Sequence, residues 1–345
     1  MNSEAPAPLL TAKDYASDQE VRWCPGCGDY AILKAVQKTL AEAAAPREKT
    51  VFVSGIGCSS RFPYYMATYG FHTIHGRAPA VATGIKLTNP ELDIWLVTGD
   101  GDGLSIGGNH LMHLLRRNVD LQVLLFNNEV YGLTKGQYSP TSQPGMVSPS
   151  TPRGSVDAPL HPATFALGCG ASFVARSADT MQKHLVSTFH RARGHRGTSF
   201  VEILQNCIIY NDGIFDSLTS KKTAADHVVE AAHGEPLIFG AAHDKGLRLN
   251  PRTLSLEVVS LAADGGNADD ILIHDETNRP LAGLLAALGG PDFPTVVGVI
   301  YRAPAATFET AVLDQVADRP SLDSAQRDIH ALLTGGATWR VGDEA

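Results

Sequence analysis

One pattern of strand, glycine-rich turn, helix and strand constrains the fold of this chain more than any other. An apolar run at residues 94–98 has the length of a buried parallel strand, and Gly99-Asp100-Gly101 follows it directly. Apolar residues at helical spacing cover residues 106–115, and a second apolar run at 121–126 ends at Asn127-Asn128. This order is typical of a βαβ unit and predicts an α/β fold with a doubly wound, mostly parallel sheet.

Two polar side chains, Asp100 and Asn128, follow the two predicted strands. A right-handed crossover places the carboxyl ends of such strands at one edge of the sheet, where α/β proteins bind ligands. A carboxylate and an amide oxygen, completed by a backbone carbonyl and phosphate oxygens, suit the octahedral shell of Mg²⁺. The pattern therefore predicts a clamp for a metal-bound diphosphate, although Gly-Asp-Gly alone is equally typical of an ordinary tight turn.

The two halves of this pattern resemble the thiamine diphosphate signature, in which Gly-Asp-Gly is followed by Asn-Asn at this spacing. The resemblance implies that Asp100 and Asn128 bind Mg²⁺, with the carbonyl of Val130 as the third protein ligand. It also implies that the backbone at Gly101 and Asp102 meets the diphosphate. The signature does not identify the reaction.

Composition limits the class of protein. The chain has 345 residues, of which 43% are hydrophobic and 19% charged, enough for one large domain and an appendage. A net charge of −8 and a pI near 5.9 argue against binding to nucleic acid. The first twenty residues lack a signal-peptide pattern, and no apolar run has the length of a membrane span. We expect a cytoplasmic protein with protein and small-molecule partners, and neither nucleic acid nor membrane among them.

Five cysteines, an odd number, argue against a disulfide framework in a chain without an export signal. Cys24 and Cys27 form a CxxC motif, whereas Cys58 and Cys207 are single and each follows a predicted strand. In a doubly wound sheet the four thiols could converge near the predicted diphosphate. Cys169 lies among small residues and is expected to be a packed core thiol.

Four thiolates suit either Zn²⁺ or a [4Fe–4S] cluster. The CxxC motif alone favours a zinc site, and a thioredoxin-like dithiol is a further alternative, although the strand that such a motif follows is missing here. Structural zinc sites usually pair two short motifs. The two remote single cysteines therefore favour a cluster.

Several separate segments resemble the β subunit of the 2-oxoacid:ferredoxin oxidoreductases, most closely the 2-oxoglutarate type, over most of residues 20–240. The matching segments are Trp23-Cys24-Pro25-Gly26-Cys27-Gly28, Gly55-Ile56-Gly57-Cys58-Ser59, His75-Gly76-Arg77-Ala78, Gly99-Asp100-Gly101-Asp102, Asn127-Asn128-Glu129-Val130-Tyr131-Gly132-Leu133-Thr134-Lys135-Gly136-Gln137, Gln205-Asn206-Cys207 and Asn211-Asp212-Gly213. The resemblance implies a thiamine diphosphate-binding fold in which Cys24, Cys27, Cys58 and Cys207 ligate one [4Fe–4S] cluster.

The resemblance also implies a reaction. It is the thiamine-dependent oxidative decarboxylation of 2-oxoglutarate with coenzyme A to succinyl-CoA, CO₂ and reduced ferredoxin, potentially reversible. The same chemistry on pyruvate or another 2-oxo acid stays open. A non-oxidative thiamine-dependent decarboxylase or carboligase, and a metal-bearing assembly subunit without catalysis, are further alternatives.

One metal signature and one doubly wound unit are present, whereas enzymes of this group bind the pyrimidine ring of the cofactor on a second domain. We therefore expect an α subunit, or a fused α/γ subunit, to supply that domain in an α₂β₂ heterotetramer. Ferredoxin is the expected electron acceptor.

His75 and Lys135 are the candidate catalytic residues. His75 is a plausible proton shuttle, and Lys135 resembles the family's lysine at the substrate pocket, where it could pair with a distal carboxylate. Without the family motif, a packed histidine and a solvated lysine are the simpler interpretations. The candidate cofactor contacts are Ile56, Gly57, Ser59, His75, Gly99, Gly101, Asp102, Asn127, Leu133 and Thr134.

The sequence suggests an N-terminal arm at residues 1–20, a domain at 21–245 that binds thiamine diphosphate, Mg²⁺ and the cluster, and a C-terminal extension at 246–345. The extension is expected to wrap the core or contact the partner subunit. Helices are predicted at 180–193, 253–263, 282–288 and 305–316, and residues 205–245 are predicted to be irregular.

Two further segments allow more than one interpretation. Residues 129–160 are rich in Ser, Thr, Pro and Gly without periodicity, which predicts a long loop acting as a substrate lid or a subunit-contact arm. The basic cluster Arg191, Arg193, His195 and Arg196 is most simply a solvated helix end, or else a docking site for an acidic ferredoxin.

Overall fold

The computed structural model describes residues 10–261, 268–318, 333–336 and 339. Contacts divide the chain into two units, Met1–Glu309 and Thr310–Ala345. The first unit contains the α/β core and the segments that the sequence analysis assigned to function. Within the described residues, no helix combines the length and the hydrophobicity that crossing a membrane requires.

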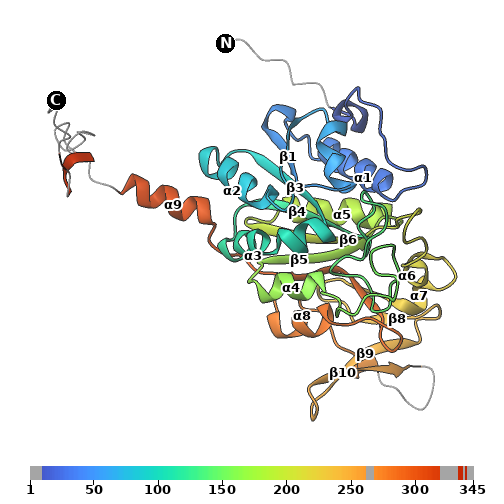
Figure 1. Cartoon of the computed structure of the whole chain (residues 1–345). Helices are drawn as coiled ribbons and strands as arrows, with labels where there is room; N and C mark the ends of the chain where they lie inside the picture. The colour runs from blue at the N-terminus through green and yellow to red at the C-terminus, as the bar shows by residue number, and fades with distance from the viewer. Residues whose placement is uncertain (1–9, 262–267, 319–332, 337–338, 340–345) are drawn as a thin grey trace. The chain divides into compact units, whose positions relative to one another are not determined.

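An eight-stranded sheet forms the centre of the first unit (Figure 1). Its strand order is β2-β1-β3-β4-β6-β5-β11-β7. The first six of these strands pair in parallel, β11 is antiparallel to β5, and β7 is parallel to β11. The predicted doubly wound, mostly parallel sheet is therefore confirmed. The strands are β1 (Thr50–Ser54), β2 (Tyr69–His72), β3 (Asp93–Gly99), β4 (Leu121–Asn127), β5 (Phe173–Ala178), β6 (Thr198–Leu204), β7 (Val228–Ala231) and β11 (Thr295–Arg302).

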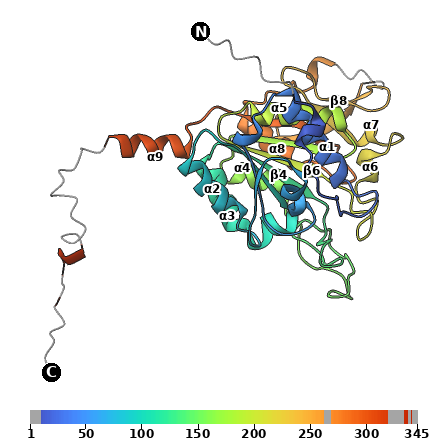
Figure 2. The same cartoon turned by 90° about the horizontal axis from the view of Figure 1, so that it is seen from above.

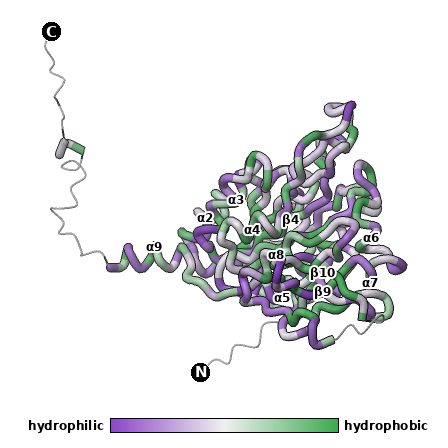
Figure 3. The backbone as a smooth tube through the Cα atoms, turned by 90° about the horizontal axis from the view of Figure 1, so that it is seen from below, coloured by the Kyte–Doolittle hydropathy of each residue, from purple (hydrophilic) through white to green (hydrophobic). Residues whose placement is uncertain are grey.

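Helices cover both faces of the sheet because successive strand residues alternate between two hydrophobic clusters. Phe52 and Trp95 pack on the side of α1 (Asp29–Glu42) and α5 (Gln182–Arg193), whereas their neighbours pack on the other side. The opposite layer contains α2 (Ala78–Thr88), α3 (Gly108–Arg117), α4 (Pro162–Gly168) and α8 (Arg279–Ala286). Figure 1 shows α1 above the strands and α4 and α8 below them, and Figure 2 shows α2 and α3 side by side. Figure 3 shows hydrophobic backbone in the interior around β4.

The strand order creates a crevice at the carboxyl edge of the sheet. The chain leaves β1 toward β2 on one side and returns to β3 on the other, so the connections diverge between β1 and β3. Doubly wound folds bind ligands at such a switch point. The turns after β1, β3 and β4 meet there.

The C-terminal part of the first unit departs from the sequence predictions. The predicted helix at 253–263 is wrong, because a turn at 251–254 reverses the chain into β10 (Ser255–Ser260), which pairs antiparallel with β9 (Lys245–Asn250). A third strand, β8 (Ile238–Phe239), completes this smaller sheet. The predictions for α5, α8 and α9 (Phe308–Ala317) are confirmed.

Residues 205–245 were predicted to be irregular, and this is wrong in part. They contain α6 (Asp216–Thr219), α7 (Ala224–His227), β7 and β8, each too short to produce a periodic pattern. The long irregular segment at 129–160 is confirmed, since it contains neither helix nor strand. Short helical turns occur at Ala12–Tyr15, Arg47–Lys49, Ser59–Tyr65, Asp102–Ile106 and Ala268–Asp270.

The break in contacts at Glu309 lies well after residue 245, where the sequence suggested a boundary. The reason is β11, which carries an apolar strand from the C-terminal region into the main sheet beside β5. The segment from β9 to β11 therefore belongs to the core unit. Residues after Glu309 form the separate unit.

The basic cluster at the end of α5 is paired within the protein. Arg191 contacts Glu276, and Arg193 Nε lies 2.7 Å from Asp93 Oδ2. His195 is buried against Ser172, with the two side chains 2.8 Å apart. The cluster also lies at the opposite end of α5 from the carboxyl edge of the sheet, about 18 Å away for a 12-residue helix. This geometry argues against the cluster as a ferredoxin site close to the cysteines.

Candidate active site

A pocket of about 100 Å³ opens at the switch point between β1 and β3. Its walls come from the turns after β1, β3 and β4 and from the segment before α2. It is lined by Ile56, Gly57, Cys58, Ser59, His75, Gly99, Asp100, Gly101, Asp102, Phe126, Asn128, Val130, Tyr131, Gly132, Leu133 and Thr134. The structure therefore brings together every residue that the sequence analysis assigned to the cofactor or to Mg²⁺, except Asn127.

The buried side chain of Asp102 connects the segments that form this pocket through hydrogen bonds. Its Oδ1 accepts hydrogen bonds from the backbone amides of Gly76 at 2.7 Å and Ile56 at 3.1 Å, and from His75 Nδ1 at 2.6 Å. Its Oδ2 accepts from the hydroxyl of Thr98 at 2.7 Å. The buried carboxylate thus ties three chain segments together. Because its oxygens are fully engaged, only its backbone is available to a ligand.

His75 is oriented by this carboxylate. A carboxylate can only accept, so the contact assigns the ring proton to Nδ1 and leaves Nε2 of the neutral ring as a proton acceptor. The ring lies edge-on to Tyr131 at 6.5 Å and stays partly exposed at the pocket wall. A fixed tautomer at a pocket wall suits a proton-transfer role.

Asp100 is a buried carboxylate without a cationic partner. It is 3% exposed, and its Oδ2 accepts from the hydroxyls of Ser139 at 2.6 Å and Thr141 at 2.7 Å. Burial raises the pKa of Asp100 above its usual range, whereas the two hydroxyl hydrogen bonds oppose that shift. None of the ion pairs among the described residues involves Asp100. A divalent cation would supply the missing positive charge, so the donor set fits Mg²⁺.

Asn128 and Val130 lie beside Asp100 in the same pocket. The Asn128 side-chain oxygen accepts from the Val130 amide at 3.2 Å, and its nitrogen donates to Gln205 at 2.7 Å. Asn211 donates to the Asn128 carbonyl at 2.9 Å. These contacts fix the Asn128 amide with its oxygen toward the Val130 backbone.

Asn127 faces away from this pocket. Its nitrogen donates to Glu202 at 2.9 Å, its oxygen accepts from Thr141 at 2.9 Å, and Glu202 pairs with Arg176 at 2.8 Å. Asn127 and Glu129 instead line a second pocket of about 610 Å³ on the other side of β4. Asn127 therefore belongs to the buried network behind Asp100 and has no place in the wall of the smaller pocket.

A tight turn from Tyr131 to Gln137 forms the outer wall. Its ends are joined by the Tyr131 amide donating to the Gln137 carbonyl at 2.9 Å. Leu133 and Thr134 line the pocket, whereas Lys135 is exposed and is not among the lining residues. Lys135 has a positive φ of 78°, a backbone conformation that residues other than glycine rarely adopt.

Position 101 requires glycine because its backbone lies against the Tyr131 ring. The Tyr131 hydroxyl donates to the Gly101 carbonyl at 3.0 Å. A Cβ atom at Gly101 would lie 2.2 Å from Tyr131 Cε1. We expect Gly101→Ala to lower stability by about 1–3 kcal/mol through overpacking, measured as a fall in the midpoint of thermal unfolding. Gly84→Ala is the matched control, since Gly84 is exposed on α2 with open space around it and alanine favours the helix. Equal midpoints for the two variants would contradict the close approach.

The four cysteines predicted to act together gather at the same edge. A Cβ atom at Gly132 would lie 3.4 Å from Cys207 Sγ and 3.7 Å from Cys58 Sγ, so both sulfurs flank that glycine. The Trp23 indole donates to the Cys58 carbonyl at 2.7 Å. Gln205 Nε2 lies 3.4 Å from Cys27 Sγ. Cys58 and Gly132 also line the smaller pocket, so the thiols adjoin it directly.

Burial disfavours free thiolates at this position. It raises the pKa of Cys58 to about 12 and raises that of Cys27 as well, and the nearby Asp29 carboxylate and the other cysteines add to both shifts. If these half-buried thiols were thiolates, they would repel one another. They therefore fit the binding of a group that neutralises their negative charge. Among the described residues, no three His, Cys, Asp or Glu side chains are close enough to hold a single metal ion.

The fifth cysteine behaves as expected. Cys169 caps the C-terminus of α4 and packs against the hydrophobic core. Burial raises the pKa of its thiol, and no other titratable group contributes.

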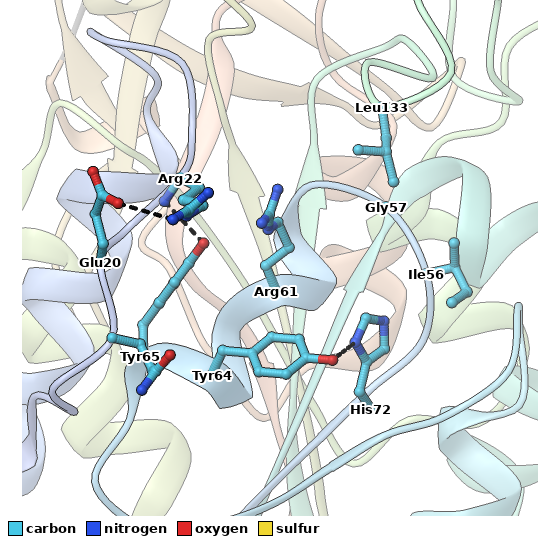
Figure 4. A pocket seen from close by; sticks show the side chains of 10 residues that line it. Glu20, Arg22, Ile56, Gly57, Arg61, Tyr64, Tyr65, His72 and Leu133 are labelled. Carbon is cyan, nitrogen blue, oxygen red and sulfur yellow. Dashed lines mark hydrogen bonds and ion pairs between the residues drawn. The ribbon is translucent and has the colours of Figure 1, made fainter.

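A third pocket, shown in Figure 4, adjoins the smallest pocket, which contains Asp100. Its volume is about 410 Å³, and it shares Ile56, Gly57 and Leu133 with the smaller pocket. Arg61 points into it, and no hydrogen bond or ion pair of the described residues involves its guanidinium (Figure 4). Arg22 lies on the same wall but pairs with Glu20 at 3.1 Å.

Sequence analysis missed four side chains at this edge: Arg61, Tyr131, Ser139 and Thr141. Arg61 follows Cys58 by three residues, a spacing that could have directed attention to it. Ser139 and Thr141 come from an aperiodic loop, so no pattern could place them on Asp100.

Comparison with known proteins agrees with this geometry. Residues 55–203 match the family described as thiamine pyrophosphate enzyme, C-terminal TPP binding domain. The chain is 49% identical over 333 residues to 2-oxoglutarate oxidoreductase subunit KorB of Mycobacterium tuberculosis, covering 95% of this chain and 88% of that protein. It is 42% identical over 185 residues to 2-oxoglutarate synthase subunit KorB of Archaeoglobus fulgidus, covering 54% of this chain and 69% of that protein.

A solved structure is similar over nearly the whole chain. It is the 2-oxoglutarate:ferredoxin oxidoreductase of Magnetococcus marinus with 2-oxoglutarate, coenzyme A and succinyl-CoA bound. The TM-score is 0.75 and the sequence identity 32%, covering 95% of this chain and 97% of that one. The fold and site thus define a thiamine diphosphate-dependent enzyme subunit. The chain belongs to the β subunits of the 2-oxoacid:ferredoxin oxidoreductases, which confirms the resemblance stated from its sequence.

Proposed function

We propose that this chain is the β subunit of an enzyme that oxidatively decarboxylates 2-oxoglutarate with coenzyme A and passes the electrons to ferredoxin. One observation supports the oxidative chemistry most directly. Cys58 lines the same pocket as Asp100 and Asn128, so the predicted cluster and the predicted diphosphate clamp share a wall. A non-oxidative thiamine enzyme has no use for four thiols at that position.

The pocket supports half of a thiamine site. Enclosed small-molecule sites measure roughly 300–1,000 Å³, and about 100 Å³ is too little for the whole cofactor. When bound, thiamine diphosphate supplies an electron sink for loss of CO₂ from the 2-oxo acid. In this chain Asp100, Asn128 and the Val130 carbonyl would hold Mg²⁺, and the backbone from Gly99 to Asp102 would contact the diphosphate. An α, or fused α/γ, subunit would supply the remainder in an α₂β₂ assembly.

The predicted roles of the other pocket residues follow from their positions. His75 holds its proton at Nδ1 through Asp102, so Nε2 can accept a proton at the pocket wall. Ile56, Gly57, Ser59, Leu133 and Thr134 enclose the cofactor. Lys135 lies outside the wall, so a role in catalysis requires the side chain to approach the substrate from the turn.

The adjoining cavity supports a substrate with a second carboxylate. The Arg61 guanidinium lines this cavity without an ion-pair partner among the described residues, and a carboxylate is its natural partner. 2-Oxoglutarate carries such a group at the end of its side chain, whereas pyruvate does not. The M. marinus structure was solved with 2-oxoglutarate and coenzyme A bound, which favours the same substrates here.

Replacing Arg61 by methionine keeps most of the side chain and removes its charge. We expect KM for 2-oxoglutarate to rise about 10- to 100-fold, the value of one charge-assisted hydrogen bond, with a smaller change in kcat. KM for pyruvate should stay the same, because pyruvate has no distal carboxylate. Arg252→Met, in the exposed turn between β9 and β10, is the control. Equal effects on both substrates would refute the assignment.

The proposed function is tested on the complex of this chain with its partner subunit, purified without oxygen. Reduction of ferredoxin with coenzyme A is compared on 2-oxoglutarate and pyruvate. We expect a clear preference for 2-oxoglutarate. A preference for pyruvate would overturn the substrate, and CO₂ release without any reduction of an acceptor would favour the non-oxidative alternative.

A further inference from the structure

An apolar turn beside the four cysteines is exposed to solvent. Ile208, Ile209 and Tyr210 follow Cys207 directly and are 36%, 56% and 39% exposed. Tyr30, on the first turn of α1, is 37% exposed. A contiguous patch of exposed apolar side chains is typical of an interaction site.

The turn is rigid, so its exposure is built into the fold. The Asn211 amide donates to the Cys207 carbonyl at 3.0 Å, and the Asn211 side chain donates to the Asn128 carbonyl at 2.9 Å. The Asn206 side chain donates to Asp212 at 2.8 Å. These bonds hold both ends of the turn, while its three apolar side chains stay partly exposed.

The turn lies against the CxxC motif. A Cβ atom at Gly26 would lie 2.9 Å from Ile208 Cδ1. Cys24 is exposed, whereas Cys27, Cys58 and Cys207 are partly buried. Cys24, Tyr30, Ile208, Ile209 and Tyr210 are exposed residues of the segments that carry Cys24, Cys27 and Cys207, and we call this set the exit patch.

We propose that the exit patch is the docking surface for a small one-electron carrier protein. The inference rests on the proposed function, because it requires the cluster. In the step concerned, one electron passes from the reduced cluster to the oxidised carrier, the cluster returns to its oxidised state, and no bond or proton moves. Such transfer demands close approach, and the exit patch belongs to the exposed segments that carry the thiols.

The chemistry of the patch fits this class of partner. Electron-transfer complexes are weak and bury small areas, and their contact centres are apolar with few charges. The exit patch has apolar side chains at its centre and no Lys, Arg, Asp or Glu among its members. The basic cluster of α5, by contrast, is already paired and lies at the far edge of the sheet. Docking is therefore apolar in character.

The test uses the complete complex with Ile209→Asp and Ile209→Lys. Both substitutions insert a charge at the most exposed member of the patch. We expect each to weaken ferredoxin binding, measured by calorimetry, about 10- to 100-fold. Leu254→Asp, at an exposed apolar position in the turn between β9 and β10, is the matched control and should leave binding unchanged.

Three further readouts separate this inference from its alternatives. Subunit assembly, iron content and the rate of reduction of methyl viologen, a small acceptor that needs no docking, should match the wild type. Unchanged ferredoxin affinity in both variants, or tighter binding by Ile209→Lys, would overturn apolar docking while leaving the proposed function intact. Loss of subunit assembly would show that the patch contacts the partner subunit instead. A wild-type complex that reduces neither acceptor would overturn the proposed function and this inference with it.

Discussion

Asp100→Ala is expected to abolish Mg²⁺-dependent binding of thiamine diphosphate, with affinity at least about 10³-fold lower, or roughly 4 kcal/mol. Asp100 is the carboxylate of the predicted Mg²⁺ shell, it is buried, and the described residues offer it no cation. The metal would neutralise both this carboxylate and the diphosphate. Calorimetry of the purified complex with thiamine diphosphate and Mg²⁺ measures the effect directly.

The variant Asp100→Asn removes the negative charge of the side chain and keeps its size and shape. The amide oxygen can still accept from Ser139 and Thr141, so the loop that carries them should stay in place. We expect cofactor affinity to fall nearly as far as in the alanine variant, while thermal stability and iron content match the wild type. Full cofactor affinity in Asp100→Asn would contradict the need for its negative charge at the metal site.

Cys207→Ser is expected to remove the cluster and to reduce ferredoxin-linked activity to background. Cys207 and Cys58 flank Gly132 next to the pocket, so loss of either thiolate opens the predicted four-thiolate set. Iron and acid-labile sulfide should fall together, because the sulfide belongs to the cluster. Thiamine diphosphate binding should persist, since Asp100 and Asn128 are unchanged.

Cys169→Ala is the control for that loss. Cys169 packs in the hydrophobic core and the sequence does not assign it to the cluster. Its variant should keep full iron content and activity, with at most a modest loss of stability. A loss of iron in Cys169→Ala, or full retention of iron in Cys207→Ser, would mean that the cysteine assignment is wrong.

The sheet and the core of the site could be predicted from the sequence because local patterns determine both. Buried parallel strands are continuous apolar runs, and polar residues directly after them must lie at the carboxyl edge. That reasoning placed Asp100, Asn128 and the turn after β1 in one pocket. The positions of Cys58 and Cys207 follow in the same way, because each comes within four residues of the end of a strand, β1 or β6.

The residues that sequence reasoning missed are those that depend on tertiary packing. Ser139 and Thr141 reach Asp100 from a loop with no periodicity, and nothing in their local sequence shows where that loop lies. The turn of Asn127 toward Glu202 depends on the buried pair with Arg176 two strands away. The helix predicted at 253–263 fails for the same kind of reason, since pairing with β9 overrides local preference.

We propose that this chain holds a thiamine diphosphate clamp and an iron–sulfur cluster against one wall, so that substrate oxidation reduces the cluster. Low-temperature electron paramagnetic resonance of the anaerobic complex tests it most directly. We expect the signal of a reduced [4Fe–4S] cluster after addition of 2-oxoglutarate and coenzyme A, and no such signal in Asp100→Ala, which still shows it with dithionite. A protein that contains zinc without sulfide, or a cluster that dithionite reduces but substrate does not, would contradict the claim.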